Sequence, residues 1–79
     1  MPDAEVALLR ARAKCMEDDI VREIGWGNKQ SDIASMYARL IALGPESEVS
    51  WTRINYAITA YWTGKSALKR IKEMAWKRM

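Results

Sequence analysis

The clearest fold signal in this chain lies in residues 28–43, NKQSDIASMYARLIAL. Its large apolar side chains recur three, four, seven and eight positions apart, at Ile33, Met36, Tyr37, Leu40 and Ile41. That spacing gathers them on one face, because an α-helix turns once every 3.6 residues. Gly44 and Pro45 then stop the pattern, since Gly favours a left-handed cap and Pro cannot continue the helical hydrogen bonds. We therefore predict an amphipathic helix over residues 29–43.

Working outward from this stretch, three further helices are expected over residues 3–24, 48–62 and 65–78. The first carries an apolar stripe at Val6, Leu9, Ala13, Met16, Ile20 and Ile24. Glycine-containing turns at residues 25–27 and 63–64 separate the segments. No segment alternates with a period of two, so a sheet is not expected. The predicted fold class is all-α, a compact bundle of three to four short helices forming one domain over residues 1–79.

The two C-terminal segments carry apolar stripes of their own. In the third, the stripe consists of Trp51, Ile54, Ile58 and Trp62, and in the fourth of Leu68, Ile71, Ala75 and Met79. The chain has four Trp and three Tyr but no Phe. We expect Trp51 and Trp62 to lie in the core and to fill volume that Phe would otherwise supply.

The composition excludes several kinds of chemistry. There is no His and one Cys, which removes His-based catalysis, His metal sites, disulfides within the chain and cysteine zinc clusters. Cys15 lacks a neighbouring base to activate it, and three adjacent acids, residues 17–19, point in different directions on a helix. Residues 63–66, TGKS, resemble the end of a phosphate-binding loop but lack its upstream glycine and strand. We expect a non-enzymatic protein without metal or cofactor.

Charge is unevenly distributed along the chain. Residues 1–48 hold six basic and nine acidic side chains, whereas residues 49–79 hold seven basic and one acidic, giving +6. Such asymmetry suggests a nucleic acid or an acidic protein surface as partner. The expected binding residues lie on the third helix and the basic end: Arg53, Asn55, Tyr56, Lys65, Lys69, Arg70, Lys77 and Arg78. Arg and Asn can read base edges, and Tyr can stack on bases, so nucleic acid is the first expectation.

A helix-turn-helix unit is the standard motif to weigh for such a protein. Residues 38–43 and 50–62 would be its two helices, with Gly44 in the turn. The connection is longer than the usual three to four residues, and its two glutamates would face phosphate unfavourably. The motif therefore fits badly.

Two smaller groups of residues suggest protein contacts. Trp26, in a turn, and Trp76, at the edge of the last apolar stripe, are candidate anchors, because Trp dominates many interfaces. Opposite the main stripe of the first helix lies a second apolar seam that includes Leu8, Ala11 and Cys15. This seam suggests a homodimer; the alternative is a mildly apolar surface with high helix propensity.

The pattern Trp51-x-x-Ile54-Asn55-x-Ala57-Ile58, Trp62 and Leu68-x-x-Ile71-Lys72-x-x-Ala75-Trp76, with residues 23–27, resembles small helical proteins of proteobacterial phages and prophages. The resemblance implies a genomic setting and no activity. In that setting, such proteins act as regulators on DNA or as stoichiometric inhibitors of host complexes, including anti-CRISPR proteins. With a lone Cys, no apolar leader and no membrane segment, we expect a protein of the bacterial cytoplasm.

Overall fold

A computed structural model describes residues 3–79, which form four α-helices and one short 3-10 helix. The elements are α1 (Asp3–Gly25), α2 (Gln30–Ala42), η1 (Pro45–Ser47), α3 (Trp51–Tyr61) and α4 (Ala67–Lys77). Within this part of the chain there is no strand, which confirms the predicted all-α helical bundle.

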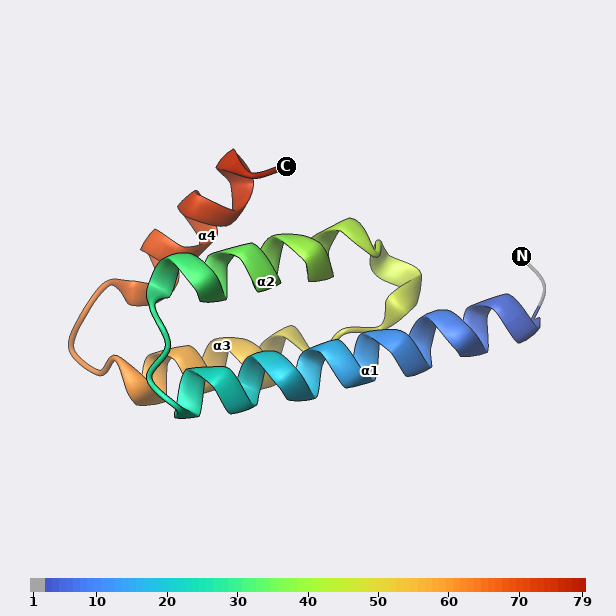
Figure 1. The fold of residues 1–79 in the computed structure, drawn as a ribbon, viewed down its shortest axis with the longest axis horizontal. Helices are drawn as coiled ribbons and strands as arrows, with labels where there is room; N and C mark the ends of the chain where they lie inside the picture. Colours follow the sequence, from blue (N-terminus) through green and yellow to red (C-terminus); the bar gives the residue numbers. More distant parts are fainter. Residues whose placement is uncertain (1–2) are drawn as a thin grey trace.

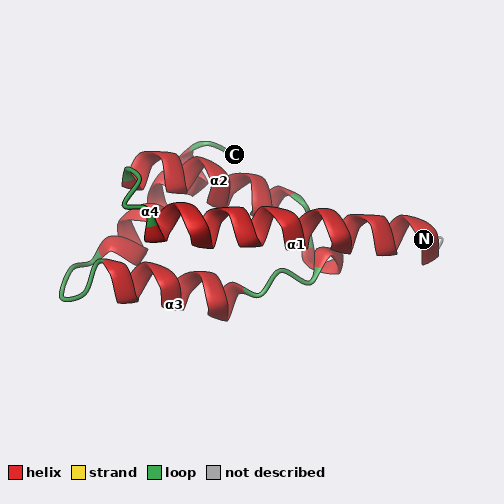
Figure 2. Cartoon of the chain, turned by 60° about the horizontal axis from the view of Figure 1, so that its bottom comes forward, coloured by secondary structure: helices red, strands yellow, loops and turns green. Residues whose placement is uncertain are grey.

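The helices pack in a closed order in which each contacts two others. Contacts run from α1 to α2, from α2 to α4, from α4 to α3 and from α3 back to α1. Figure 1 shows α4 crossing α2 obliquely, and Figure 2 shows α3 and α2 on opposite sides of α1. This arrangement turns one face of every helix toward a shared core and leaves the outer face of α4 uncovered.

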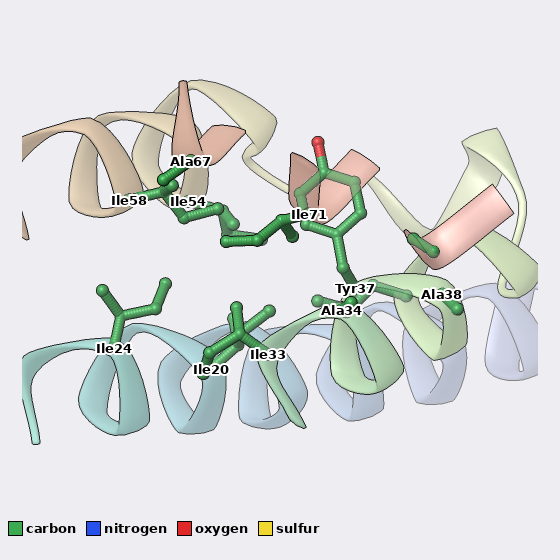
Figure 3. Close-up of a cluster of buried hydrophobic side chains, with 12 residues drawn as sticks. Ile20, Ile24, Ile33, Ala34, Tyr37, Ala38, Ile54, Ile58, Ala67 and Ile71 are labelled. Carbon is green, nitrogen blue, oxygen red and sulfur yellow. The ribbon is translucent and has the colours of Figure 1, made fainter. Parts of the chain in front are cut away.

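The core is built almost entirely from isoleucine and alanine (Figure 3). Its largest fully buried side chains are Ile20, Ile24, Ile33, Leu40, Ile54, Ile58 and Ile71. Ala34 and Ala38 on α2 and Ala67 and Ala75 on α4 are also buried, and α2 and α4 are in contact. Small side chains let two helix backbones approach closely, so α4 is held against α2 by packing along its inner face.

The two tryptophans expected in the core lie at its margin. Trp51 and Trp62 are only partly buried and pack against the outside of the isoleucine cluster. Trp51 lies against Tyr37, with ring centroids 4.7 Å apart, and Tyr37 is the one aromatic of residues 3–79 that is itself buried. Met79, expected on the inner stripe, lies beyond the end of α4 and is exposed. A core of Ile and Ala has no space for an indole, so these rings cover its edge.

Helix boundaries differ most from expectation around η1. The predicted start at residue 48 moves to Trp51, because Pro45 opens a 3-10 turn and Glu48 adopts a left-handed backbone with φ 55°. The connection from α2 to α3 therefore contains η1 and a stretch without regular structure, unlike the short turn of a helix-turn-helix unit. Likewise α4 begins at Ala67, because Gly64, with φ 71°, redirects the chain before it.

The first part of α1 extends past the rest of the molecule. Residues 3–12, which precede the first buried residue of α1, are here called the N-terminal arm, and Figure 1 shows the start of α1 extending beyond α2, α3 and α4. The body begins at Ala13, the first buried residue of α1, whereas Val6 and Leu9 on the same stripe are only partly buried. The periodicity of α1 correctly indicates its inner face but not where along the helix the core begins.

Gly27 provides a test of the turn between α1 and α2. Its φ is 78°, and a Cβ at this position would overlap the Tyr61 hydroxyl of α3. We expect Gly27→Ala to lower the free energy of unfolding by about 1–2 kcal/mol, because both the backbone strain and the overlap oppose it. The matched control is Gly25→Ala, where a Cβ meets nothing within 4 Å. Urea unfolding followed by circular dichroism measures both, and equal stabilities of the two variants would contradict the assignment.

Candidate functional site

The outer face of α4 concentrates positive charge, because this helix has four basic residues and one acidic residue. Its inner face buries Ala67, Ile71 and Ala75, which leaves the opposite side to solvent. That exposed side carries Lys69, Lys72, Trp76 and Lys77, and Lys65 lies two residues before the helix. Within α4, Lys69, Lys72 and Trp76 follow one another at intervals of three and four residues. These three therefore form a row along one side of the helix.

The lysines of this face are free of intramolecular partners. None of the four takes part in an ion pair or side-chain hydrogen bond with any residue of the described chain. Glu73 is the one acidic residue of α4. By contrast, several acids of residues 1–48 are paired internally: Glu17, Asp18, Asp19 and Glu48. Folding thus neutralises much of the negative charge and leaves the positive charge of α4 available.

Trp76 stands between two open hollows. The first, of about 430 Å³, lies where α4 faces α2, η1 and the start of α3, and is lined by Tyr37, Leu40, Ile41, Gly44, Pro45, Trp51, Lys72 and Trp76. The second, of about 580 Å³, runs along α4 and is lined by Ser66, Leu68, Lys69, Lys72, Glu73 and Trp76. Lys72 and Trp76 line both. We call these two hollows with Lys69, Lys72 and Trp76 the basic groove.

Lys72 was not among the binding residues expected from the sequence. Its signal was nevertheless visible, because it continues the spacing of Lys65 and Lys69 toward Trp76. The hollow beside it was not foreseeable, since its walls come from α2, η1 and α3 as well as α4.

The two candidate anchors have different surroundings. Trp76 is 65% exposed and Trp26 is 69% exposed. The ring of Trp26 is covered in part by Arg22, whose guanidinium carbon lies 5.5 Å from the ring centroid. Trp76 instead adjoins the apolar walls of the basic groove. Exposure is thus similar, but of the two tryptophans only Trp76 combines it with a hollow and neighbouring lysines.

Arg53, expected on the binding surface, lies in an internal polar network. Its Nη1 donates to Glu17 Oε2 at 2.9 Å and also to Asp18. Glu17 is 4% exposed and accepts a second hydrogen bond, of 2.8 Å, from the backbone N–H of Ser50 at the start of α3. Lys14 lies 3.1 Å from Asp18. The network joins α1 to the beginning of α3, so Arg53 is engaged within the fold.

The network also perturbs its own ionisable groups. Burial would raise the pKa of Glu17, but the hydrogen bonds from Ser50 and Arg53 and the charge of Lys14 outweigh it, so the pKa lies below its ordinary value. Hydrogen bonds from Arg53 and Lys14 likewise lower the pKa of Asp18. The same bonds to Asp18 and Glu17 raise the pKa of Arg53. All three groups are therefore held in their charged forms.

Of the other residues expected to bind a partner, some form hydrogen bonds within the fold and one is exposed to solvent. Asn55 accepts a hydrogen bond of 2.9 Å from the Tyr37 hydroxyl, and burial raises the pKa of Tyr37 even though this bond opposes the shift. Arg70 donates to Gln30, and Arg78 donates to Ser35 and to the backbone of Met74. Tyr56, in contrast, is 74% exposed on α3.

The seam expected on the first helix lies at the surface of α1. Leu8 is 67% exposed, and both Ala11 and Cys15 are exposed. These residues lie opposite the stripe that faces the core. None of them lines either hollow of the basic groove, so the two surfaces share no residue.

For residues 3–79, no group of three acidic or cysteine side chains is arranged to hold a metal ion. Over the same residues, none of the helices is long and apolar enough to cross a membrane. No protein-family model, curated protein or solved structure matches this chain.

Proposed function

We propose that this protein is a binding module that docks an acidic protein surface in its basic groove, with Trp76 as the central anchor. The observation that carries the proposal is the position of Trp76, 65% exposed between two hollows and beside lysines that have no partner within the described chain.

The energetic argument rests on what binding would bury. A large exposed apolar side chain beside a hollow gains most from leaving water, and tryptophan is among the residues that dominate interface energetics. The walls of the first hollow, among them Leu40, Ile41 and Pro45, supply apolar contact for a side chain of the partner. Lys69 and Lys72 at the rim attract carboxylates, which speeds encounter and sets orientation.

An acidic protein fits this surface better than nucleic acid does. Side chains suited to reading bases, Arg53 and Asn55, are held in hydrogen bonds within the fold. Arg70 and Arg78 are also bonded to neighbouring side chains. What remains available is lysine around an apolar hollow, which resembles the rim and core of a protein interface. Nucleic acid stays the second candidate, because a row of unpaired lysines can follow a phosphate backbone.

The test compares variants of the groove with matched variants elsewhere. Tagged wild-type protein, Trp76→Ala and Lys69→Glu/Lys72→Glu are used to capture proteins from nuclease-treated bacterial lysate. The matched controls are Trp26→Ala, similarly exposed on another part of the surface, and Lys29→Glu/Arg39→Glu, which changes exposed charges at the N-cap of α2 and on α2 itself. The proposal expects one acidic protein to be retained by the wild type and both controls. Its affinity, measured after purification, should fall by roughly 30-fold in Trp76→Ala, the loss expected of a hot-spot residue.

Oligonucleotide binding is measured on the same variants. The second candidate, nucleic acid, predicts that single- or double-stranded DNA binds the wild type at low salt and that this binding weakens steeply as salt rises. It also predicts that the same DNA fails to bind Lys69→Glu/Lys72→Glu. If the groove variants retained the same proteins and the same DNA as the wild type, the basic groove would not be the binding site.

A further inference from the structure

The N-terminal arm has an outer face that nothing in the described chain covers. Its hydrogen bond and its ion pair to the rest of the described chain come from Arg10, which bonds to the backbone of Glu46 and pairs with Glu48 on the inner side. On the outer side, Leu8 is 67% exposed, and a shallow hollow there is lined only by residues of α1 itself, Glu5, Leu8, Leu9 and Arg12. The arm thus presents an apolar ridge that no other residue of the described chain covers.

We propose that this ridge pairs with the same ridge of a second copy of the chain, with the two α1 helices antiparallel. The ridge consists of Ala4, Leu8, Ala11 and Cys15, which recur at intervals of four, three and four residues and therefore share one side of the helix. The core-facing residues Ala13, Ile20 and Ile24 lie on the opposite side. Pairing along the ridge therefore points the two helical bodies away from each other, and they do not collide.

The order of charges along the arm favours a second copy of the arm as the partner of the ridge, and it favours an antiparallel orientation of the two helices. Acidic Asp3 and Glu5 lie at the start of α1, and basic Arg12 and Lys14 follow two turns later. Glu5 and Arg12 lie on the same flank of the ridge, and neither has an ion-pair partner within residues 3–79. An antiparallel two-fold pair sets each flank against the same flank of the partner, so Glu5 faces Arg12 of the second copy, twice. In a parallel pair, the acidic end of one arm would lie beside the acidic end of the other, and the basic ends would also lie side by side, so like charges would repel.

Side-chain size sets the register. Placing Ala4 opposite Cys15 of the second copy brings Leu8 opposite Ala11, so each large side chain meets a small one. The helices can then approach closely along the ridge, and Leu8 is removed from water. The contact is short, well below the roughly 1,200 Å² of a standard stable interface, so a weak dimer that forms at high protein concentration is expected.

Cross-linking through the single native cysteine tests both direction and register. In the proposed pair, the two Cys15 residues lie at opposite ends of the contact, roughly 16 Å apart along the axis from the helical rise, too far for a disulfide. Ala4→Cys should therefore give a cross-linked dimer on mild oxidation, through position 4 and Cys15 of the second copy. Wild-type protein and Ala42→Cys, exposed on α2, should cross-link far less. Equal cross-linking of wild type and Ala4→Cys would overturn the antiparallel register.

Charge exchange tests the pairing without cysteine chemistry. Sedimentation velocity over a concentration series should show a concentration-dependent dimer for the wild type. Leu8→Arg should weaken association at least tenfold, and Arg12→Glu should weaken it as well, whereas Glu5→Arg/Arg12→Glu should restore it by exchanging both charges. A wild type that stays monomeric at every concentration, or a double variant no better than Arg12→Glu, would refute the proposal. Trp76→Ala should dimerise normally, so this result and that of the basic groove are independent.

Discussion

Glu17→Ala is expected to lower the free energy of unfolding by about 3 kcal/mol, a large share of the stability of a domain this small. The side chain is buried, and its loss leaves the Ser50 N–H without its acceptor and Arg53 without its buried partner. The matched control is Asp18→Asn, which removes a second carboxylate bonded to Arg53 from a more exposed position. Urea unfolding should show little change for this control, and equal losses in the two variants would mean that Glu17 has no special role.

The same carboxylate predicts how stability depends on pH. Because the folded-state pKa of Glu17 lies below its ordinary value of 4.5, its contribution is fully present above that value. Stability is lost as pH falls through the lowered folded-state pKa, since the protonated acid no longer pairs with Arg53. Glu17→Gln keeps an acceptor for Ser50 but cannot titrate, so its loss of stability in acid should be smaller than that of the wild type. Asp18 contributes in the same direction, because its pKa is lowered too.

Ile71→Ala is expected to cost about 2–5 kcal/mol, because Ile71 is fully buried where α4 meets the core. For a domain of this size, that loss corresponds to a fall in Tm of roughly 8–40 °C. The matched control is Lys72→Ala, one position along on the exposed side, which should unfold like the wild type. Ile71→Val should fall between them, since it removes one methyl group.

This variant also links stability to the proposed binding surface. Ala67, Ile71 and Ala75 attach α4 to the core, and α4 carries the lysines and Trp76 of the basic groove. Hydrogen exchange should therefore be faster in α4 of Ile71→Ala than in α1. If the exchange rates of α4 were unchanged while global stability fell, α4 would not open separately from the rest.

The sequence predicts structure correctly for those residues whose conformation depends on neighbours a few positions away along the chain. The apolar spacing in residues 28–43 predicts α2, and the glycine turns predict where helices end to within a few residues. The start of α3 was placed too early, because the left-handed backbone at Glu48 and the 3-10 turn before it leave only a weak local signal. The sequence does carry a signal for Glu17, because this residue lies on the core side of α1 between Ala13 and Ile20, where a charge needs a partner.

The candidate binding surface divides along the same line. The sequence by itself determined the helical class, the inner faces of the helices and the concentration of positive charge at the C-terminal end, because periodicity and local charge need no knowledge of distant contacts.

Only the tertiary structure decided which charges are free. Arg53 is engaged because folding brings it to Glu17, 36 positions away along the chain, whereas Lys69 and Lys72 meet no carboxylate. Packing of α2, η1 and α3 beside α4 likewise decided that Trp76, and not Trp26, stands at a hollow. Ion pairs such as Arg53–Glu17 and the hollow beside Trp76 are formed by residues far apart in sequence, so the spacing of residues along the chain does not predict them.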